Sequence, residues 1–92
     1  MDELKPPREK LGLYIRDPLG VTFKGIVDSI TTFNSKGVFD ILGIHENFIT
    51  IIKDKLIYRN KDGVKEVKLK TGILKVEENI VQVFIGTEKL AE

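Results

Sequence analysis

The sequence predicts an all-β domain, built as a two-sheet β-sandwich or flattened barrel of short antiparallel strands. Short segments rich in Val, Ile, Phe, Tyr and Thr, the residue types that favour strands, are separated by turn-forming residues. Apolar and polar residues alternate with a period of two in residues 67–70 and 11–15. No segment keeps the i, i+3, i+4, i+7 apolar spacing over the roughly ten residues that a surface helix needs. Packed sheets or a barrel also leave fewer exposed edges than one small sheet.

Turn-forming residues mark where each expected strand ends. The strongest hairpin signal is at residues 60–63, because Asp-Gly lies there between two apolar-rich runs. Further turns are expected at residues 17–20, 34–37, 53–54 and 77–79. The strands expected between them are residues 11–16, 21–23, 26–33, 38–41, 48–52, 55–59, 64–70, 73–76 and 80–85.

The length and charge of the chain indicate a single domain. Ninety-two residues are too few for a second hydrophobic core. Residues 1–10 are charged and interrupted by proline, without the apolar stretch of a secretory signal, so they are expected to form a flexible N-terminal tail. The β-sandwich domain is expected over residues 11–86, followed by a short C-terminal tail at 87–92. A formal net charge of +1 supplies no broad field that would hold nucleic acid or an anionic membrane.

Composition excludes most catalytic and cofactor chemistry. Without cysteine the chain has no disulfide, thiol nucleophile or thiolate metal site, and a single histidine makes a multi-histidine zinc site impossible. The glycine-rich phosphate loops of nucleotide-binding proteins are absent. The apolar runs are far shorter than the roughly 20 residues of a membrane-spanning helix. We therefore expect no cofactor and no metal.

The one local group of Asp, His and Glu allows two interpretations. Asp40, His45 and Glu46 could act as metal ligands or as an acid–base pair, in which case the protein would be an enzyme. Alternatively, His45 orders a loop and the two acids are solvated, which is the favoured interpretation because no second histidine and no known ligand spacing accompany them. Glu77 and Glu78 are expected to be turn residues and not paired catalytic carboxylates, because adjacent strand residues point to opposite sides.

Lysines along the second half of the chain suggest a basic stripe. On a small barrel such a stripe, with aromatic rings for stacking, could bind single-stranded nucleic acid. The stripe would comprise Lys53, Lys55, Arg59, Lys61, Lys65, Lys68, Lys70 and Lys75, with Tyr14, Phe48 or Tyr58 as the stacking rings. Acidic residues alternate with these lysines, and alternating lysines are typical of a solvent-facing strand. We therefore expect no nucleic-acid partner.

The order and spacing of three segments resemble a known family. Residues 23–30 fit an aromatic-x-Gly-x-Val-x-x-Ile pattern, residues 35–45 a glycine-containing loop that runs into an Ile-Leu-x-x-His signature, and residues 72–83 a Gly-Ile-x-x-Val, turn, Val-x-Val ending. Together these segments resemble the N-terminal β-sandwich domain of the epsilon subunit of rotary ATP synthases. His45 falls on the family's histidine.

The sequence also departs from the family pattern. Gly43 and Ile44 stand where the family has Pro-Gly, and Glu46-Asn47 stand where it has Ala-Pro. Phe39-Asp40 replace what is usually Leu-Gly. Family members usually continue into two C-terminal helices that restrain rotation or respond to ATP. The sequence stops at Glu92, before such helices, so the expectation is a subunit without those helical roles.

The resemblance implies a non-catalytic rotor subunit of an ATP synthase. In the family this domain packs on the gamma subunit, rests on the polar loops of the membrane c-ring and transmits torque. It would be peripheral to the cytoplasmic face of the cell membrane, attached only through the complex. The residues expected in the ring-facing loop and the adjoining signature loop are Ser35, Lys36, Gly37, Val38, Phe39 and His45. Gly25, Gly43 and Gly72 are expected to serve backbone geometry. The alternative is a free-standing binding module for oligonucleotide or carbohydrate.

Overall fold

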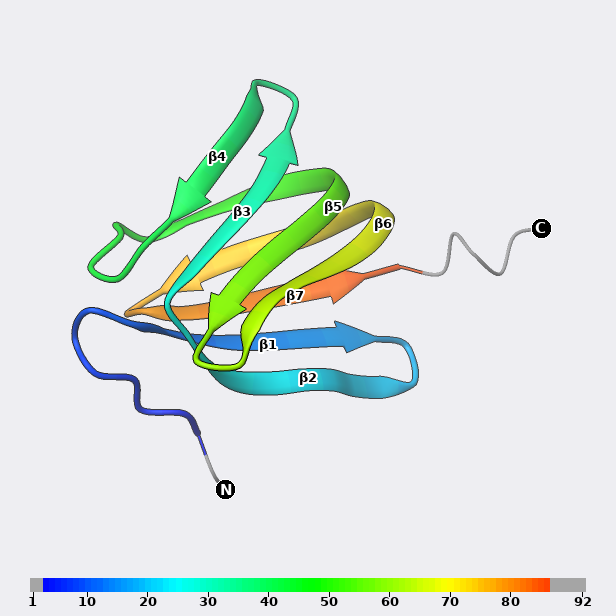
Figure 1. Cartoon of the computed structure of the whole chain (residues 1–92). Coiled ribbons are helices and arrows are strands. Elements are labelled where there is room, and N and C mark those ends of the chain that lie inside the picture. Colours follow the sequence, from blue (N-terminus) through cyan, green and yellow to red (C-terminus); the bar gives the residue numbers. More distant parts are fainter. Residues whose placement is uncertain (1–2, 87–92) are drawn as a thin grey trace.

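A computed structural model describes residues 3–86, which form seven strands and no helix (Figure 1). The strands are β1 (Leu11–Asp17), β2 (Gly20–Val27), β3 (Ser29–Asn34), β4 (Gly37–Ile41), β5 (Phe48–Asn60), β6 (Gly63–Glu77) and β7 (Ile80–Ile85). The all-β prediction is confirmed. The short C-terminal tail expected at 87–92 lies outside the described residues. Within residues 3–86 no helix is long and apolar enough to cross a membrane.

The strands hydrogen-bond as one mixed sheet in the order β2-β1-β7-β6-β5-β3-β4. Neighbouring strands in this described part of the chain are antiparallel, as expected, except that β1 and β7 are parallel, with Leu13 opposite Val81. Local turns predict hairpins well, but the β1–β7 pair joins segments from opposite ends of the chain. A parallel pair requires a long connection, and β2 to β6 provide it here.

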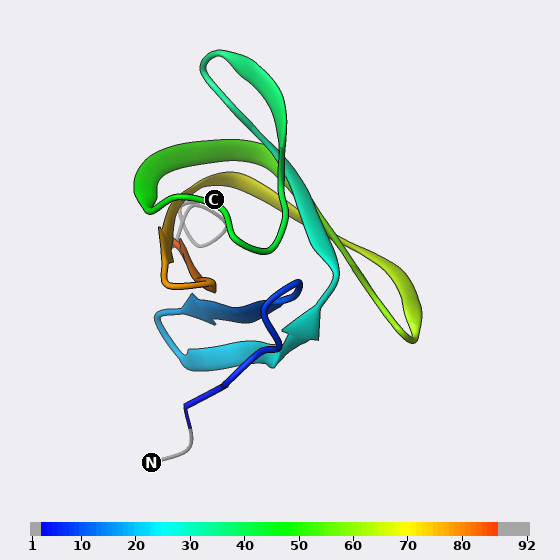
Figure 2. The same cartoon turned by 90° about the vertical axis from the view of Figure 1, so that its left-hand side faces the viewer.

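Strand β2 runs through residues 24–25, where a break was expected, and the chain bends instead at Asp28, within the strand expected at 26–33. Strands β5 and β6 are longer than predicted because Lys53-Asp54 forms an irregularity within β5 and not a turn. The pairing steps from Thr71 to Leu69 on β6 while it advances from Lys53 to Asp54 on β5, and Asp54 has a φ of 73°. Such a β-bulge bends the strands and increases their twist. As a result β5 and β6 run through 13 and 15 residues, and the sheet coils around its inner face (Figure 2).

The inner face of the coiled sheet holds the hydrophobic core. The largest fully buried side chains are Leu11, Leu13, Ile15, Val27, Ile30, Ile41, Ile52, Leu56, Leu74, Val76, Val81 and Val83. The Phe23 ring of β2 packs against the Tyr58 ring of β5, with centroids 4.5 Å apart, so the sheet closes across strands that are not neighbours in it. Aromatic pairs at this separation add to the free energy gained by burial.

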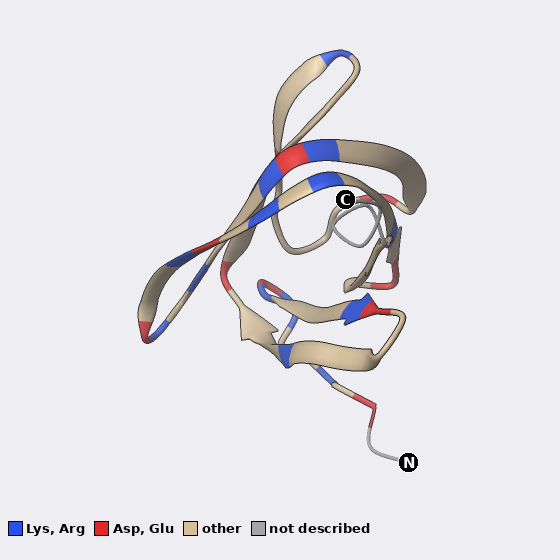
Figure 3. Ribbon diagram, turned by 90° about the vertical axis from the view of Figure 1, so that its right-hand side faces the viewer, with Lys and Arg blue, Asp and Glu red and all other residues tan. Residues whose placement is uncertain are grey.

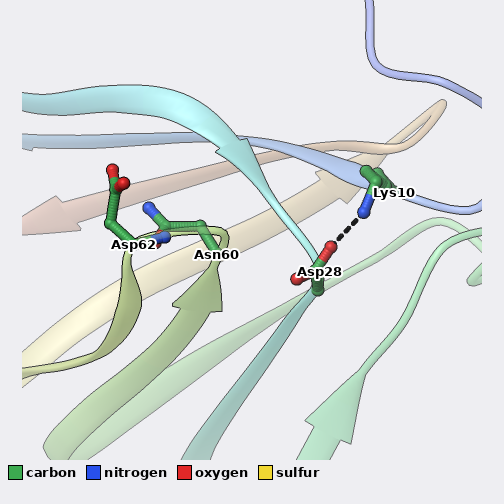
Figure 4. Close-up of polar contacts among 4 residues, drawn as sticks. All are labelled: Lys10, Asp28, Asn60 and Asp62. Atoms are coloured by element: carbon green, nitrogen blue, oxygen red, sulfur yellow. Dashed lines mark hydrogen bonds and ion pairs between the residues drawn. The ribbon is translucent and has the colours of Figure 1, made fainter.

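Polar contacts fix the corner between β2 and β3. Lys10 forms an ion pair with Asp28, and the backbone N–H of Asp28 donates to the carbonyl of Arg59 at 2.6 Å. The Arg59 guanidinium in turn donates to Thr31 Oγ1 at 3.0 Å. Figure 4 shows the Lys10–Asp28 pair beside the β5–β6 turn, whose Asn60 Oδ1 accepts from the backbone N–H of Asp62. The corner thereby joins the chain before β1 to three strands.

A candidate interaction site at the end of the sheet

The residues predicted for the ring-facing loop lie in one β-hairpin. Ser35 and Lys36 form the tight turn between β3 and β4, where the Lys36 N–H donates to Asn34 Oδ1 at 2.9 Å and Gly37 has a φ of 120°. Gly37, Val38 and Phe39 belong to β4 itself. Val38 is 62% exposed, whereas Phe39 is half-buried against the core. His45 lies in the loop at the opposite end of β4, residues 42–47.

Phe48 connects β4 with the loop that carries His45. Its ring lies 6.1 Å from that of Phe39, nearly edge to face, and 4.9 Å from that of His45. His45 Nδ1 is 2.9 Å from the carbonyl oxygen of Glu46. A carbonyl only accepts, so Nδ1 carries the proton and donates. Phe39, His45 and Phe48, named here the aromatic cluster, therefore bring two of the predicted interface residues together. The role of Phe48 as their connection was not predicted.

The loop at residues 42–47 is held by the turn between β6 and β7. Asn79 Oδ1 accepts from the Ile44 N–H, and Asn79 Nδ2 donates to the carbonyl of Arg8, both at 2.9 Å. The carbonyl of Asn79 also accepts from the Gly12 N–H at 2.9 Å. Glu78 and Asn79 have φ values of 52° and 63°, the left-handed conformation that a two-residue type I′ hairpin turn requires. One asparagine therefore joins β1, this loop and the N-terminal segment.

Three predicted structural glycines lie at close approaches. A Cβ on Gly43 would be 2.4 Å from the carbonyl carbon of Glu9, which belongs to the backbone of the N-terminal segment. A Cβ on Gly72 would be 3.0 Å from the Phe84 carbonyl oxygen, and one on Gly25 would be 2.9 Å from the Phe23 ring. Gly43 therefore lets the backbone of Arg8 and Glu9 pack against the loop. The same N-terminal segment contacts β1, where the Leu4 N–H donates to the Tyr14 hydroxyl at 2.9 Å.

This arrangement suits contact with another surface and not acid–base chemistry. Asp40 accepts a hydrogen bond from Thr31 Oγ1 at 2.6 Å, whereas His45 packs on Phe48. In the part of the chain that the structure describes, no three His, Cys, Asp or Glu residues are placed to hold a metal ion. Exposed apolar side chains follow β4 into the loop: Val38, Leu42 and Ile44 are 62%, 58% and 60% exposed. Exposed apolar groups beside aromatic rings are typical of interfaces.

Residues 3–86 thus form an all-β domain that presents exposed apolar side chains beside aromatic rings at one end. Residues 10–88 match the family described as ATP synthase, Delta/Epsilon chain, beta-sandwich domain. The chain therefore belongs to this family, as the resemblance implied.

Individual relatives agree with this assignment. The ATP synthase epsilon chain of Endomicrobium trichonymphae is 29% identical over 75 residues, covering 80% of this chain and 54% of the relative. That of Citrifermentans bemidjiense is 35% identical over 86 residues, covering 91% and 62%. This chain thus spans between about half and two thirds of the length of these relatives.

Two solved structures share the fold. A chain of the Euglena gracilis mitochondrial ATP synthase superposes with a TM-score of 0.77 at 16% identity, covering 91% of this chain and 54% of that one. A chain of the Tetrahymena thermophila mitochondrial ATP synthase central stalk and c-ring gives 0.72 at 13% identity, covering 87% and 66%. These matches concern the fold, since the identities are low.

Proposed function

We propose that the protein is a non-catalytic central-stalk subunit of a rotary ATP synthase, of the epsilon type. The family match over residues 10–88 carries this proposal. The relatives are epsilon chains, and one of the similar structures is a central stalk with its c-ring. The subunit would link the gamma subunit to the c-ring and transmit torque, and it would be peripheral to the cytoplasmic face of the membrane through the complex.

The fold suits a part that transmits force. We propose that the bulge at Asp54 divides the coiled sheet into two packed layers, as the family's description as a β-sandwich implies. The inner side chains interdigitate between these layers, and close-packed interiors have low compressibility. The β3–β4 hairpin and the aromatic cluster would contact the ring, since they carry Ser35, Lys36, Gly37, Val38, Phe39 and His45.

Association with the gamma subunit tests the proposal as a whole. The purified chain, mixed with the gamma subunit from the same genome, is expected to elute as a one-to-one complex in size-exclusion chromatography with light scattering. A folded monomer that forms no complex at micromolar concentration would instead support the free-standing binding module, and a screen of oligonucleotides and carbohydrates would follow.

A matched pair of valines tests the ring contact. Val38 on β4 and Val64 on β6 are 62% and 64% exposed, so either accepts Asp without burying a charge. In membranes reconstituted with the subunit, Val38→Asp is expected to lower ATP-driven ion uptake per ATP hydrolysed several-fold, and Val64→Asp is expected to leave it unchanged. Phe39→Asp should have a larger effect. Unchanged coupling with both Val38→Asp and Phe39→Asp would contradict the placement of this hairpin against the ring.

A further inference from the structure

The N-terminal segment covers part of the outer face of the sheet. Leu13 of β1 points into the core, so its neighbours Gly12 and Tyr14 lie on the outer face. Tyr14 is nevertheless only 8% exposed. The Leu4 N–H donates to the Tyr14 hydroxyl at 2.9 Å, and a Cβ on Gly12 would be 3.1 Å from the Leu4 Cβ, so Leu4 packs on the bare backbone at that point. Residues 3–10 are named here the strap.

The strap is attached a second time, next to the loop that follows β4. The Arg8 carbonyl accepts from Asn79 Nδ2 at 2.9 Å. The backbone of Arg8 and Glu9 lies against Gly43. Residues 6 and 7, between the two attachments, are both proline. Proline fixes φ and has no N–H, so this spacer is stiff and has few conformations to lose when both ends attach. Each attachment therefore favours the other.

Charged side chains contribute little to these two attachments. Figure 3 shows residues of both signs along the strap and few on β1 and β2. The exposed charged residues of the strap are Glu3, Lys5, Arg8 and Glu9. Leu4 is held through its side chain and its N–H, and Arg8 through its carbonyl. The two attachments are therefore uncharged, so salt screens them little.

The Asn79 side chain connects the strap to the loop at residues 42–47. An amide has donors on its nitrogen and an acceptor on its oxygen. The Arg8 carbonyl only accepts, so it takes Nδ2 of Asn79 and leaves Oδ1 facing the Ile44 N–H, which donates to it at 2.9 Å. If the strap leaves, the amide is free to rotate and the Ile44 N–H loses its fixed acceptor.

The other end of the loop is held without the strap. Asn47 Oδ1 accepts from the Glu78 N–H of the β6–β7 turn at 3.0 Å. Between the strap and the loop lies a cleft of about 620 Å³, whose lining includes Leu4, Arg8 and His45. Solvent that enters this cleft reaches one side of the strap, so the strap can detach without opening the core. The loop therefore has one half that depends on the strap and one half that does not.

We propose that residues 3–10 are a releasable strap that orders the half of the loop at residues 43–44. When attached, the strap fixes the loop at Ile44, next to His45. When released, it leaves this half mobile, while the fold and the other end of the loop persist. Leu42 and Ile44 are exposed apolar side chains, and a loop ordered in advance loses less entropy when it binds. Release of the strap would therefore weaken any contact made by this end of the domain. The inference concerns the chain by itself and does not depend on the proposed function.

The test disturbs the strap at one end and measures the effect at the other. Leu4→Asp acts at β1, so an effect on the Ile44 N–H must pass through the strap. Leu19→Asp, in the β1–β2 turn, is the matched control, since Leu19 is 95% exposed. Leu4→Asp is expected to speed hydrogen exchange of the Ile44 N–H roughly tenfold and to leave that of the Glu78 N–H within about twofold. Leu19→Asp is expected to change neither rate.

Two further measurements follow the strap itself. Trypsin is expected to cleave after Arg8 faster in Leu4→Asp than in Leu19→Asp. Gly43→Ala tests the opposite direction, because its Cβ would be 2.4 Å from the strap backbone. Gly43 does not have a left-handed φ, so alanine strains no backbone there. This variant is expected to shift the NMR signals of the Tyr14 ring, and circular dichroism checks that both variants fold.

Several results would overturn the inference. Faster cleavage after Arg8 in Leu4→Asp, with unchanged exchange at Ile44, would mean that the strap leaves without loosening the loop. Unchanged cleavage and exchange in Leu4→Asp would mean that this leucine does not hold the strap. An unshifted Tyr14 ring in Gly43→Ala would mean that the two attachments are independent. An equal rise in exchange at Ile44 and throughout the sheet would mean that the segment is part of the core and not a strap.

Discussion

Ile44 has a backbone conformation that its side chain disfavours. Its φ is 65°, and left-handed backbone costs roughly 1–2 kcal/mol for a residue with a Cβ. Its side chain is 60% exposed, so burial offsets little of that cost. The hydrogen bond from its N–H to Asn79 Oδ1 helps to hold this conformation. The family pattern has glycine at the position of Ile44, and glycine adopts this conformation without strain.

Replacing Ile44 by glycine is therefore expected to stabilise the protein. Ile44→Gly should raise the free energy of unfolding by about 1 kcal/mol, since relief of strain exceeds the added entropy of the unfolded chain. Ile44→Val keeps the branched side chain and serves as the control, expected within about 0.5 kcal/mol of the original. Urea denaturation followed by circular dichroism measures both. A Gly variant less stable than the Val variant would show that the Ile44 side chain contributes more than its exposure indicates.

At the scale of elements, the β6–β7 turn positions the loop that carries His45. Its Asn79 combines a left-handed backbone with two side-chain hydrogen bonds, to the Ile44 N–H and to the Arg8 carbonyl. Asparagine adopts this conformation more readily than most residues. The same residue therefore serves the turn and the packing of two segments distant in sequence.

Two substitutions separate these roles of Asn79. Asn79→Gly keeps the turn and removes the side-chain hydrogen bonds, so it is expected to lower the free energy of unfolding by about 1–3 kcal/mol. Asn79→Ala removes the bonds and also strains the turn, so the loss should be larger by about 1 kcal/mol. Urea denaturation measures both values. Equal losses would mean that the turn conformation contributes nothing, and an unchanged Gly variant would mean that the two hydrogen bonds do not stabilise the loop.

The elements that sequence reasoning predicted are those that depend on local chemistry. The Asp62-Gly63 turn is found where expected, between β5 and β6, because its backbone requirement is met by these residues alone. Lys53-Asp54 has similar turn-forming chemistry yet lies in a bulge, because the outcome depends on how β6 pairs with it. The parallel β1–β7 pair was also not predicted, because local composition does not specify which distant strand a segment pairs with.

The candidate site also combines features that local sequence motifs predicted with features that only the folded arrangement shows. His45 and Phe39 were predicted as interface residues from the resemblance to the family, and in the structure the rings of both lie against the Phe48 ring. The contacts of Asn79 were not predicted, nor was the exposure of Ile49 and Ile51 on β5. Ile49 and Ile51 belong to an apolar run, and without the register of β6 nothing indicates which of its side chains face solvent. Both features depend on which segments lie side by side in the fold, and no single segment of the sequence indicates that.

For the molecule as a whole, an aromatic pair lies where the sheet closes on itself. Tyr58 is 8% exposed and packs against Phe23 across strands that are not hydrogen-bonded to each other. Burial disfavours the charged phenolate and raises the pKa of Tyr58 above its ordinary value of 10.0. The folded protein therefore holds this proton more tightly than the unfolded chain does.

This difference in proton affinity makes stability depend on pH in the alkaline range. Below pH 10 both states are protonated at Tyr58, and its contribution is fully present. As pH rises above 10 the unfolded chain releases the proton first, so stability falls through the raised pKa of the folded state. Tyr58→Phe keeps the ring against Phe23 and removes the hydroxyl. Its free energy of unfolding, measured in urea from pH 8 to about 11.5, should decline less steeply than that of the original. Parallel declines would show that the Tyr58 hydroxyl ionises as freely in the folded protein as in the unfolded chain, so that the sheet does not shield this side of its core.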